Sequence, residues 1–292
     1  MKKFAAVLFL ALSFLMCVGR AGAQVVHLAN STNANLLLPV PMGYDSLELA
    51  RLEFIYEQTD VDTVLSQSRD EYYILSVGDV YSYYEDYAGY RLDSACNVVN
   101  WIVTYAQGDS LSALYPSNGQ RPEVLHNMRT GLFTVNEYNV FDFYQYKDST
   151  ARFAWTLLPD TTTVCGYACR KAEATFRGIR WTAWYAPSIP IPAGPWKLNG
   201  LPGLVLWAYD DKGTHDMKLT AARKAHEKTI CERVKGYFHM KRERVNALLE
   251  RSRTAPTTYK SLSGLTVTRT DAHGNPLPEP AKRKFHVPFE LE

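Results

Sequence analysis

Residues 179–210 read IRWTAWYAPSIPIPAGPWKLNGLPGLVLWAYD, in which two aromatic segments flank a stretch rich in proline and glycine. In the first segment Trp181, Ala183 and Tyr185 alternate with other residues, so these three side chains are expected on one face of a β-strand. Thr182 and Trp184 are then expected on the opposite face. Leu204 to Tyr209 form a short apolar run that also reads as a strand.

The connection between these two strands, residues 187–203, contains five prolines and three glycines. Proline fixes φ and lacks a backbone donor, which holds the chain extended, whereas glycine permits a tight turn or a close backbone approach. One interpretation is architectural, and the other is that the loop forms the rim of a groove for an apolar or peptide ligand. The loop residues concerned are Gly194, Pro195, Gly200, Leu201, Pro202 and Gly203, and the candidate ligand-binding residues are Trp181, Trp184, Tyr185, Trp196 and Trp207.

Other segments extend the β-rich pattern, and the aromatic fraction of 13% supports it. We predict strands over 49–58, 71–77, 152–158, 164–176 and 217–221, with a break at Pro159-Asp160 and a loop over 108–130. An amphipathic helix is predicted from the apolar residues between Ile230 and Leu249, which recur every three or four positions, with its best-defined part at Val234–Leu249. The fold class is therefore α+β, dominated by a curved antiparallel sheet or half-barrel with this helix packed on it.

The N-terminal residues have the pattern of a secretory signal peptide. Lys2 and Lys3 precede an apolar stretch, and Ala21-Gly22-Ala23 provides a small-x-small cleavage site, so residues 1–23 are expected to be removed. Residues 24–292 then form a single domain, in which 24–46 are an extended lead-in and 254–292 a mostly irregular tail. No later stretch is long and apolar enough for a transmembrane helix, so we expect none after signal removal.

Charge is unevenly distributed along the mature chain. Residues 24–220 carry 14 Lys and Arg against 22 Asp and Glu, whereas residues 221–292 carry 15 against 8. Neutralisation of the acidic part by the basic part of the same molecule is the favoured explanation, and contact with anionic lipid or a polyanion is the alternative. An acidic main body with an export signal argues against a nucleic-acid partner.

The sequence identifies no catalytic residues, metal ligands or cofactor motif. It lacks a Gly-x-Ser-x-Gly nucleophile elbow, a phosphate-binding loop and a dinucleotide fingerprint. Two groupings have weak metal-binding character: Asp210, Asp211, His215 and Asp216 around a glycine, and the pair His239 and Glu243. A hairpin connection and a surface ion pair explain them more simply.

Four cysteines follow the signal segment: Cys96, Cys165, Cys169 and Cys231. Their even number permits two disulfides, with three connectivities. On one continuous strand Cys165 and Cys169 would lie about 13 Å apart, too far to bond unless a turn at Gly166 intervenes. A hydrophobic core of this size does not require disulfide bonds for stability, so we expect that at most some of these cysteines form disulfides.

Several motifs resemble the GLPGLI family of exported Bacteroidota envelope proteins. Residues 194–205 match its signature, with Val205 in place of the usual Ile, and residues 184–191 match its approach to that signature. Residues 166–172 resemble its Gly-Tyr-x-Cys-x-Lys-Ala strand, in which Cys165 has no counterpart. The resemblance implies location in the periplasm or on the periplasmic face of the outer membrane, but supplies no reaction.

Three functions remain open from the sequence. The favoured one is a non-catalytic binding or accessory module for an outer-membrane transport or assembly system, with an envelope protein, a transporter or an apolar or peptide ligand as its partner. A periplasmic hydrolase whose site assembles only in the fold is the second. A metal-handling envelope protein is the third.

Overall fold

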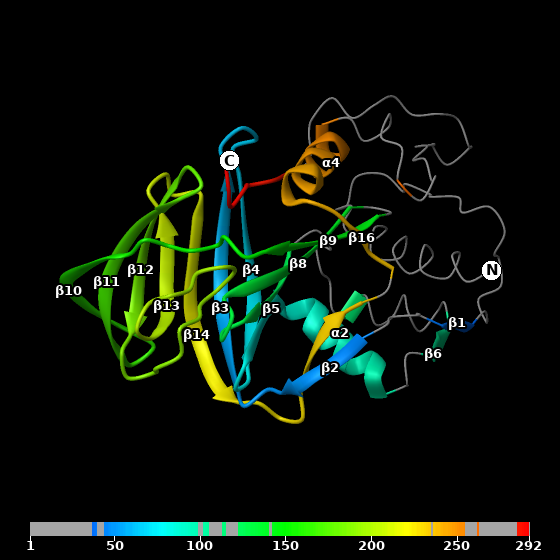
Figure 1. Ribbon diagram of the computed structural model, residues 1–292, viewed down its shortest axis with the longest axis horizontal. Helices are drawn as coiled ribbons and strands as arrows, with labels where there is room; N and C mark the ends of the chain where they lie inside the picture. Colours follow the sequence, from blue (N-terminus) through cyan, green and yellow to red (C-terminus); the bar gives the residue numbers. More distant parts are fainter. Residues whose placement is uncertain are drawn as a thin grey trace.

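One 12-stranded sheet is the main element of the computed structural model, which describes residues 37–39, 44–98, 102–104, 113–114, 122–139, 142–234, 236–254, 262 and 285–291 (Figure 1). The strands, in their order across the sheet, are β10 (Thr156–Val164), β11 (Tyr167–Phe176), β12 (Ile179–Ala186), β13 (Leu204–Asp210), β14 (His215–Lys224), β3 (Leu52–Asp62), β4 (Gln67–Val77), β5 (Tyr81–Asp86), β7 (Glu123–Asn127), β8 (Leu132–Tyr138), β9 (Phe143–Asp148) and β16 (Phe238–His239). Neighbouring strands are antiparallel except β16, which pairs with β9 in parallel. The sheet is open, since β10 and β16 lie at its two ends.

Smaller elements accompany this sheet. β1 (Leu37–Pro39) pairs with β6 (Ile102–Thr104), and β2 (Tyr44–Leu49) pairs with β15 (Thr229–Arg233). In the part of the chain that the structure describes, helix α2 spans Tyr87–Val98 and helix α4 spans Arg242–Thr254. The predicted β-dominated fold with a helix near the C-terminus is thus confirmed, although the expected lead-in already contains β1 and the start of β2.

The alternation predicted for β12 is also confirmed. Trp181 and Ala183 are fully buried and Tyr185 nearly so, whereas Thr182 and Trp184 are half-buried on the opposite face. A two-residue turn at Arg177 and Gly178 joins β11 to β12, with both residues at positive φ. This geometry suits the right-handed twist of a tight hairpin.

The Pro/Gly-rich connection 187–203 packs against the start of β13. Leu204 N donates to Ile189 O at 2.9 Å and Val205 N donates to Ala193 O at 3.0 Å, so the loop folds back onto the strand that follows it. Gly203 lies so close to β12 that an added Cβ would be 2.2 Å from the carbonyl oxygen of Ala186. Glycine is required there by a close approach of two backbone segments.

The predicted helix over Val234–Leu249 is wrong in its first half. Ile230 lies in β15 and Phe238 in β16, and only the part from Arg242 onward is helical. Gly236, at a φ of 86°, separates the two short strands. The prediction failed because apolar residues of short strands that pack on different neighbours can also recur every three or four positions, as they do in a helix. Within α4 the expected apolar stripe is present, with Val245, Leu248 and Leu249 buried.

Two further boundaries differ from prediction. The segment assigned to a loop over 108–130 contains β7, which lies between β5 and β8. The break expected at Pro159 is absent, since β10 continues through it to Val164 with a register shift between Leu157 and Thr161. Proline is tolerated there because β10 is an edge strand, where a missing donor costs no ladder hydrogen bond.

The hairpin turn at Cys165 and Gly166 separates β10 from β11, so the predicted strand 164–176 is divided. Cys165 is exposed and Cys169 is buried, and both are free thiols, as is Cys231. The side chain of Cys96 lies outside the described residues.

Candidate functional site

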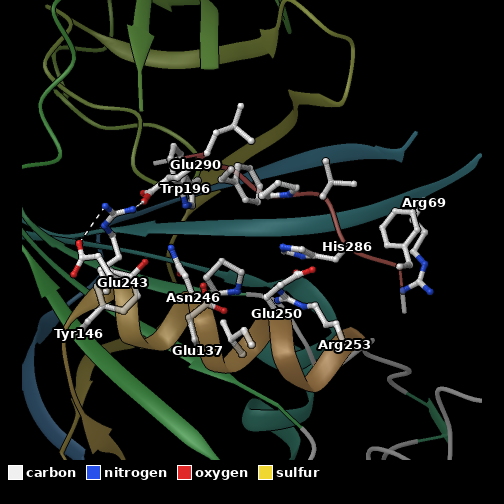
Figure 2. A pocket seen from close by; sticks show the side chains of 18 residues that line it. Arg69, Glu137, Tyr146, Trp196, Glu243, Asn246, Glu250, Arg253, His286 and Glu290 are labelled. Atoms are coloured by element: carbon white, nitrogen blue, oxygen red, sulfur yellow. Dashed lines mark hydrogen bonds and ion pairs between the residues drawn. The ribbon is translucent and has the colours of Figure 1, made fainter. Parts of the chain in front are cut away.

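A cavity of about 500 Å³ is lined by α4, by β8 and β9, and by the C-terminal segment 285–291 (Figure 2). From α4 come Glu243, Asn246, Glu250 and Arg253, which recur every three or four residues and therefore share one helix face. From the sheet come Glu137 of β8 and Tyr146 of β9, and from the Pro/Gly-rich connection comes Trp196. The C-terminal segment lies beside α4 in Figure 1 and contributes all seven of its residues to the lining.

A largely buried group of five charged side chains lies at this cavity, and two of its members, Glu290 and Arg242, line it. We call Lys197, Asp148, Glu290, Arg177 and Arg242 the Lys197 cluster. Lys197 is completely buried, and its Nζ donates to Asp148 Oδ2 at 3.0 Å and to Glu290 Oε1 at 2.6 Å. The Arg177 guanidinium donates two hydrogen bonds to Asp148, at 2.8 and 3.0 Å, and one to Glu290 at 2.8 Å. Arg242 Nη1 donates to Glu290 Oε2 at 2.7 Å.

The electrostatics of Asp148 follow from this arrangement. Burial by itself would raise the pKa of Asp148, but hydrogen bonds from Arg177 and the charge and hydrogen bond of Lys197 outweigh it and hold the pKa well below its usual range. Asp148 is therefore an ionised carboxylate committed to its cationic partners, which makes it unsuited to accepting a proton near neutral pH.

Glu137 behaves in the opposite way. Burial raises the pKa of Glu137 to about 7, against the opposing charges of Arg253 and Lys197. Nearby, burial raises the pKa of Tyr146 well above 10, and the carboxylates of Glu137 and Glu290 raise it further. The cavity thus contains one carboxyl group that is partly protonated at neutral pH.

An aromatic stack continues the site from the Lys197 cluster into the core. The ring of Phe289 lies 4.9 Å from Trp196, 6.3 Å from Trp181 and 4.1 Å from the His215 ring, all near-parallel. His215 is held on both sides, since Nδ1 lies 2.6 Å from Asp60 Oδ1 and Nε2 lies 3.0 Å from Pro288 O.

The five aromatic residues expected to bind a ligand do not converge. Trp181, Tyr185 and Trp196 are buried on the inner side of the sheet, and of the five only Trp196 lines the cavity. Trp184 and Trp207 lie on the other face, where their rings stack 6.1 Å apart. Adjacent positions of one strand face opposite ways, so Trp184 and Tyr185 cannot point into the same cavity.

The loop residues contribute unequally. Leu201 is buried, and Gly194 lies so close to β13 that an added Cβ would be 2.7 Å from Val205 Cβ. Gly200 adopts a φ of 84° in open space. These positions shape the loop, and the residue between them that carries a buried charge is Lys197, which the sequence did not predict as a site residue. Its signal was a lysine between Trp196 and Leu198 in a stretch otherwise without charge.

The groupings considered for metal binding have structural explanations. Asp210 accepts hydrogen bonds from Thr214 N at 2.7 Å, Thr214 Oγ1 at 2.8 Å and His215 N at 2.6 Å, which stabilises the β13–β14 turn. His239 and Glu243 lie on different elements, β16 and α4. Among the described residues, no three His, Cys, Asp or Glu side chains are grouped so as to hold a metal ion. Over the same ranges no helix has the length and apolarity needed to cross a membrane.

Comparisons with known proteins give a partial family match and a likeness of fold. A family model described as "Protein of unknown function (Porph_ging)" matches residues 175–207, a span that includes β12, the Pro/Gly-rich connection and Lys197. No curated protein matches the chain. Two structures of PNGF-II, in space groups P21 and C2, are similar at 13% identity with TM-scores of 0.50 and 0.47.

These alignments cover 70% of this chain but only 34% and 33% of the PNGF-II chains. The chain therefore spans about a third of the length of the solved structures that it matches. The likeness at a TM-score of 0.50 concerns the fold alone.

Proposed function

We propose that this chain is a non-catalytic binding module of the bacterial cell envelope, exported by its N-terminal segment, and that the cavity beside α4 is its ligand site. The observation that carries the proposal is the cavity itself, about 500 Å³, a volume typical of ligand pockets. Its walls combine aromatic rings, guanidinium groups and carboxylates, a mixture that suits a peptide better than a purely apolar molecule.

The charged groups next to the cavity support binding over catalysis. The carboxylates of Asp148 and Glu290 are each bonded to two or more cationic side chains, and the lowered pKa of Asp148 makes that carboxylate unsuited to accepting a proton. Among the described residues that line the cavity there is no Ser, Thr or Cys to act as a nucleophile. The resemblance to exported envelope proteins supports a role beside an outer-membrane transport or assembly system.

The test compares ligand capture by the wild-type protein with capture by a variant whose cavity is filled by a larger side chain. Tagged mature protein is incubated with cell-envelope extract and the retained peptides and proteins are identified by mass spectrometry. Asn246→Trp places a large side chain in the cavity from α4, and it should abolish retention of the ligand. Ala247→Trp is the matched control, since Ala247 is exposed on the same helix and does not line the cavity. Equal retention by the two variants would reject the cavity as the site.

A hydrolase is the second candidate, favoured by the pKa of about 7 at Glu137, which suits a general acid or base. If the protein hydrolyses the captured ligand, Glu137→Gln should abolish turnover while leaving binding intact. An unchanged rate of turnover would exclude Glu137 from any such role.

A further inference from the structure

The C-terminal segment 285–291 reaches the site without forming a strand or helix. Its backbone makes three hydrogen bonds at separate points: His286 N to Asp62 Oδ2 at 3.0 Å, His215 Nε2 to Pro288 O at 3.0 Å, and Leu291 N to Arg177 O at 2.9 Å. It therefore lies on the protein as a bound peptide does, with its side chains in separate subsites.

The first subsite holds the carboxylate of Glu290, whose side chain is 7% exposed. Lys197, Arg177 and Arg242 all donate to it, and of the Lys197 cluster only Asp148 is a second anion. Without Glu290 the cluster would hold three cations against one carboxylate, and Arg242 would retain its ion pair with the exposed Glu243 at 3.2 Å. Burying unbalanced charge is costly, so this subsite is built for an incoming anionic group.

The second subsite holds the ring of Phe289 between Trp196 and His215. Stacked aromatic rings at these separations attract one another beyond the area they bury. Since Phe289 and Glu290 are consecutive, the two subsites together recognise an aromatic residue followed by an acidic one.

The backbone at the second subsite is unusual. Trp196 adopts a φ of 52°. Left-handed backbone is unfavourable for such a bulky residue and persists where the surrounding structure imposes it.

We propose that these subsites are a recognition site for a partner polypeptide carrying an aromatic–acidic pair, and that residues 285–291 occupy it as a tethered ligand. This inference rests on the proposed binding function and places the partner's aromatic–acidic pair at the wall of the proposed cavity, in the positions that Phe289 and Glu290 now occupy. A tethered segment is present at a high effective concentration, so a partner peptide must compete with it. Occupancy by the chain's own segment therefore regulates access to the site.

The test uses the full-length chain and a fluorescein-labelled peptide of residues 285–292. In the Phe289→Ala/Glu290→Gln variant the internal competitor is weakened, so the peptide should bind about tenfold more tightly than to the wild type. A peptide carrying Gln in place of Glu290 should bind that variant roughly tenfold more weakly than the native peptide, because it loses the charge that the three cations require. Equal affinities for the two peptides, or no binding by a variant whose near-ultraviolet circular dichroism is native, would overturn the inference.

A second measurement needs no variant. Excess native peptide should accelerate hydrogen exchange at the amides of 285–291 in the wild-type chain by displacing that segment, and the Gln peptide should not. Unchanged exchange with both peptides would show that the segment is a fixed part of the fold. That result would refute the tethered-ligand proposal alone. The proposed binding function would still hold if Asn246→Trp abolished ligand capture, so the two proposals can be tested independently.

Discussion

Lys197 Nζ lies 2.6 Å from Glu290 Oε1, which joins the centre of the Pro/Gly-rich connection to a residue 93 positions later in the chain. Lys197 has no exposed surface, and moving an ammonium group out of water costs several kcal/mol unless anionic partners replace the water. Asp148 and Glu290 supply those partners from β9 and from the C-terminal segment. The connection is thereby fixed to two distant parts of the fold.

Loss of the buried ammonium should be far more costly than loss of a surface one. We expect Lys197→Met to lower the free energy of unfolding by about 3 kcal/mol, because Asp148 and Glu290 lose a common cation in a buried site. The matched control is Lys147→Met, one position before Asp148: Lys147 is 59% exposed and lies 3.7 Å from Glu232, so its loss should cost less than about 1 kcal/mol. Urea denaturation at pH 7 measures both, and equal losses would contradict the buried pairing.

The close approach at Gly203 should distinguish it from Gly200 in the same loop. A Cβ at Gly203 meets backbone atoms of Ala186 at 2.2 Å, so Gly203→Ala should destabilise the protein by about 3 kcal/mol through forced backbone movement. Gly200→Ala meets only the strain of its positive φ, since nothing lies within 4 Å of an added Cβ, and should cost about 1 kcal/mol. Thermal and urea unfolding of the two variants should rank them in that order; the reverse order would mean that the loop does not approach β12 as described.

The pKa of Glu137 predicts a definite dependence of stability on pH. Its folded value of about 7 lies above the ordinary value of 4.5, so the folded state binds the proton more tightly. The stability that this proton contributes is fully present below about pH 4.5 and is lost as pH rises through 7. Glu137→Gln should therefore raise Tm more at pH 8 than at pH 5, by roughly 3 °C for a difference on the order of 1 kcal/mol.

Glu250→Gln is the control for that measurement, since Glu250 lines the same cavity from α4 but is exposed. Its effect on Tm should be the same at the two pH values. If Glu137→Gln behaves like this control, Glu137 does not retain its proton in the folded protein.

The cysteines should differ in their reactivity toward thiol reagents. Cys165 is exposed at the β10–β11 turn, whereas Cys169 is buried and burial also raises the pKa of its thiol. Modification by a thiol reagent followed by peptide mass spectrometry should find Cys165 labelled in the native protein and Cys169 labelled only after denaturation. In the same native sample, the peptide that contains Cys165 should be labelled faster than the peptide that contains Cys169, and equal rates for these two peptides would contradict the exposure described.

Periodicity predicted the parts of the fold in which neighbouring residues decide the conformation. The alternation of Trp181, Ala183 and Tyr185 specified the faces of β12, because side chains on a strand alternate whatever lies beyond it. The same approach failed between Ile230 and Phe238, where apolar residues at helical spacing pack as two short strands against β2 and β9. Pairing with distant strands overrode the local pattern there.

By itself the sequence determined a β-rich chain with an amphipathic helix and a proline-stiffened, glycine-shaped connection, since these depend on local periodicity and backbone freedom. Only the tertiary structure decided the candidate site. In the sequence, nothing distinguishes the five charged residues of the Lys197 cluster from charged residues at the surface. They matter for the site because the fold brings them together away from water. Whether a charge is solvated at the surface or paired in the interior depends on which distant segments the fold brings into contact, and spacing along the chain does not contain that information.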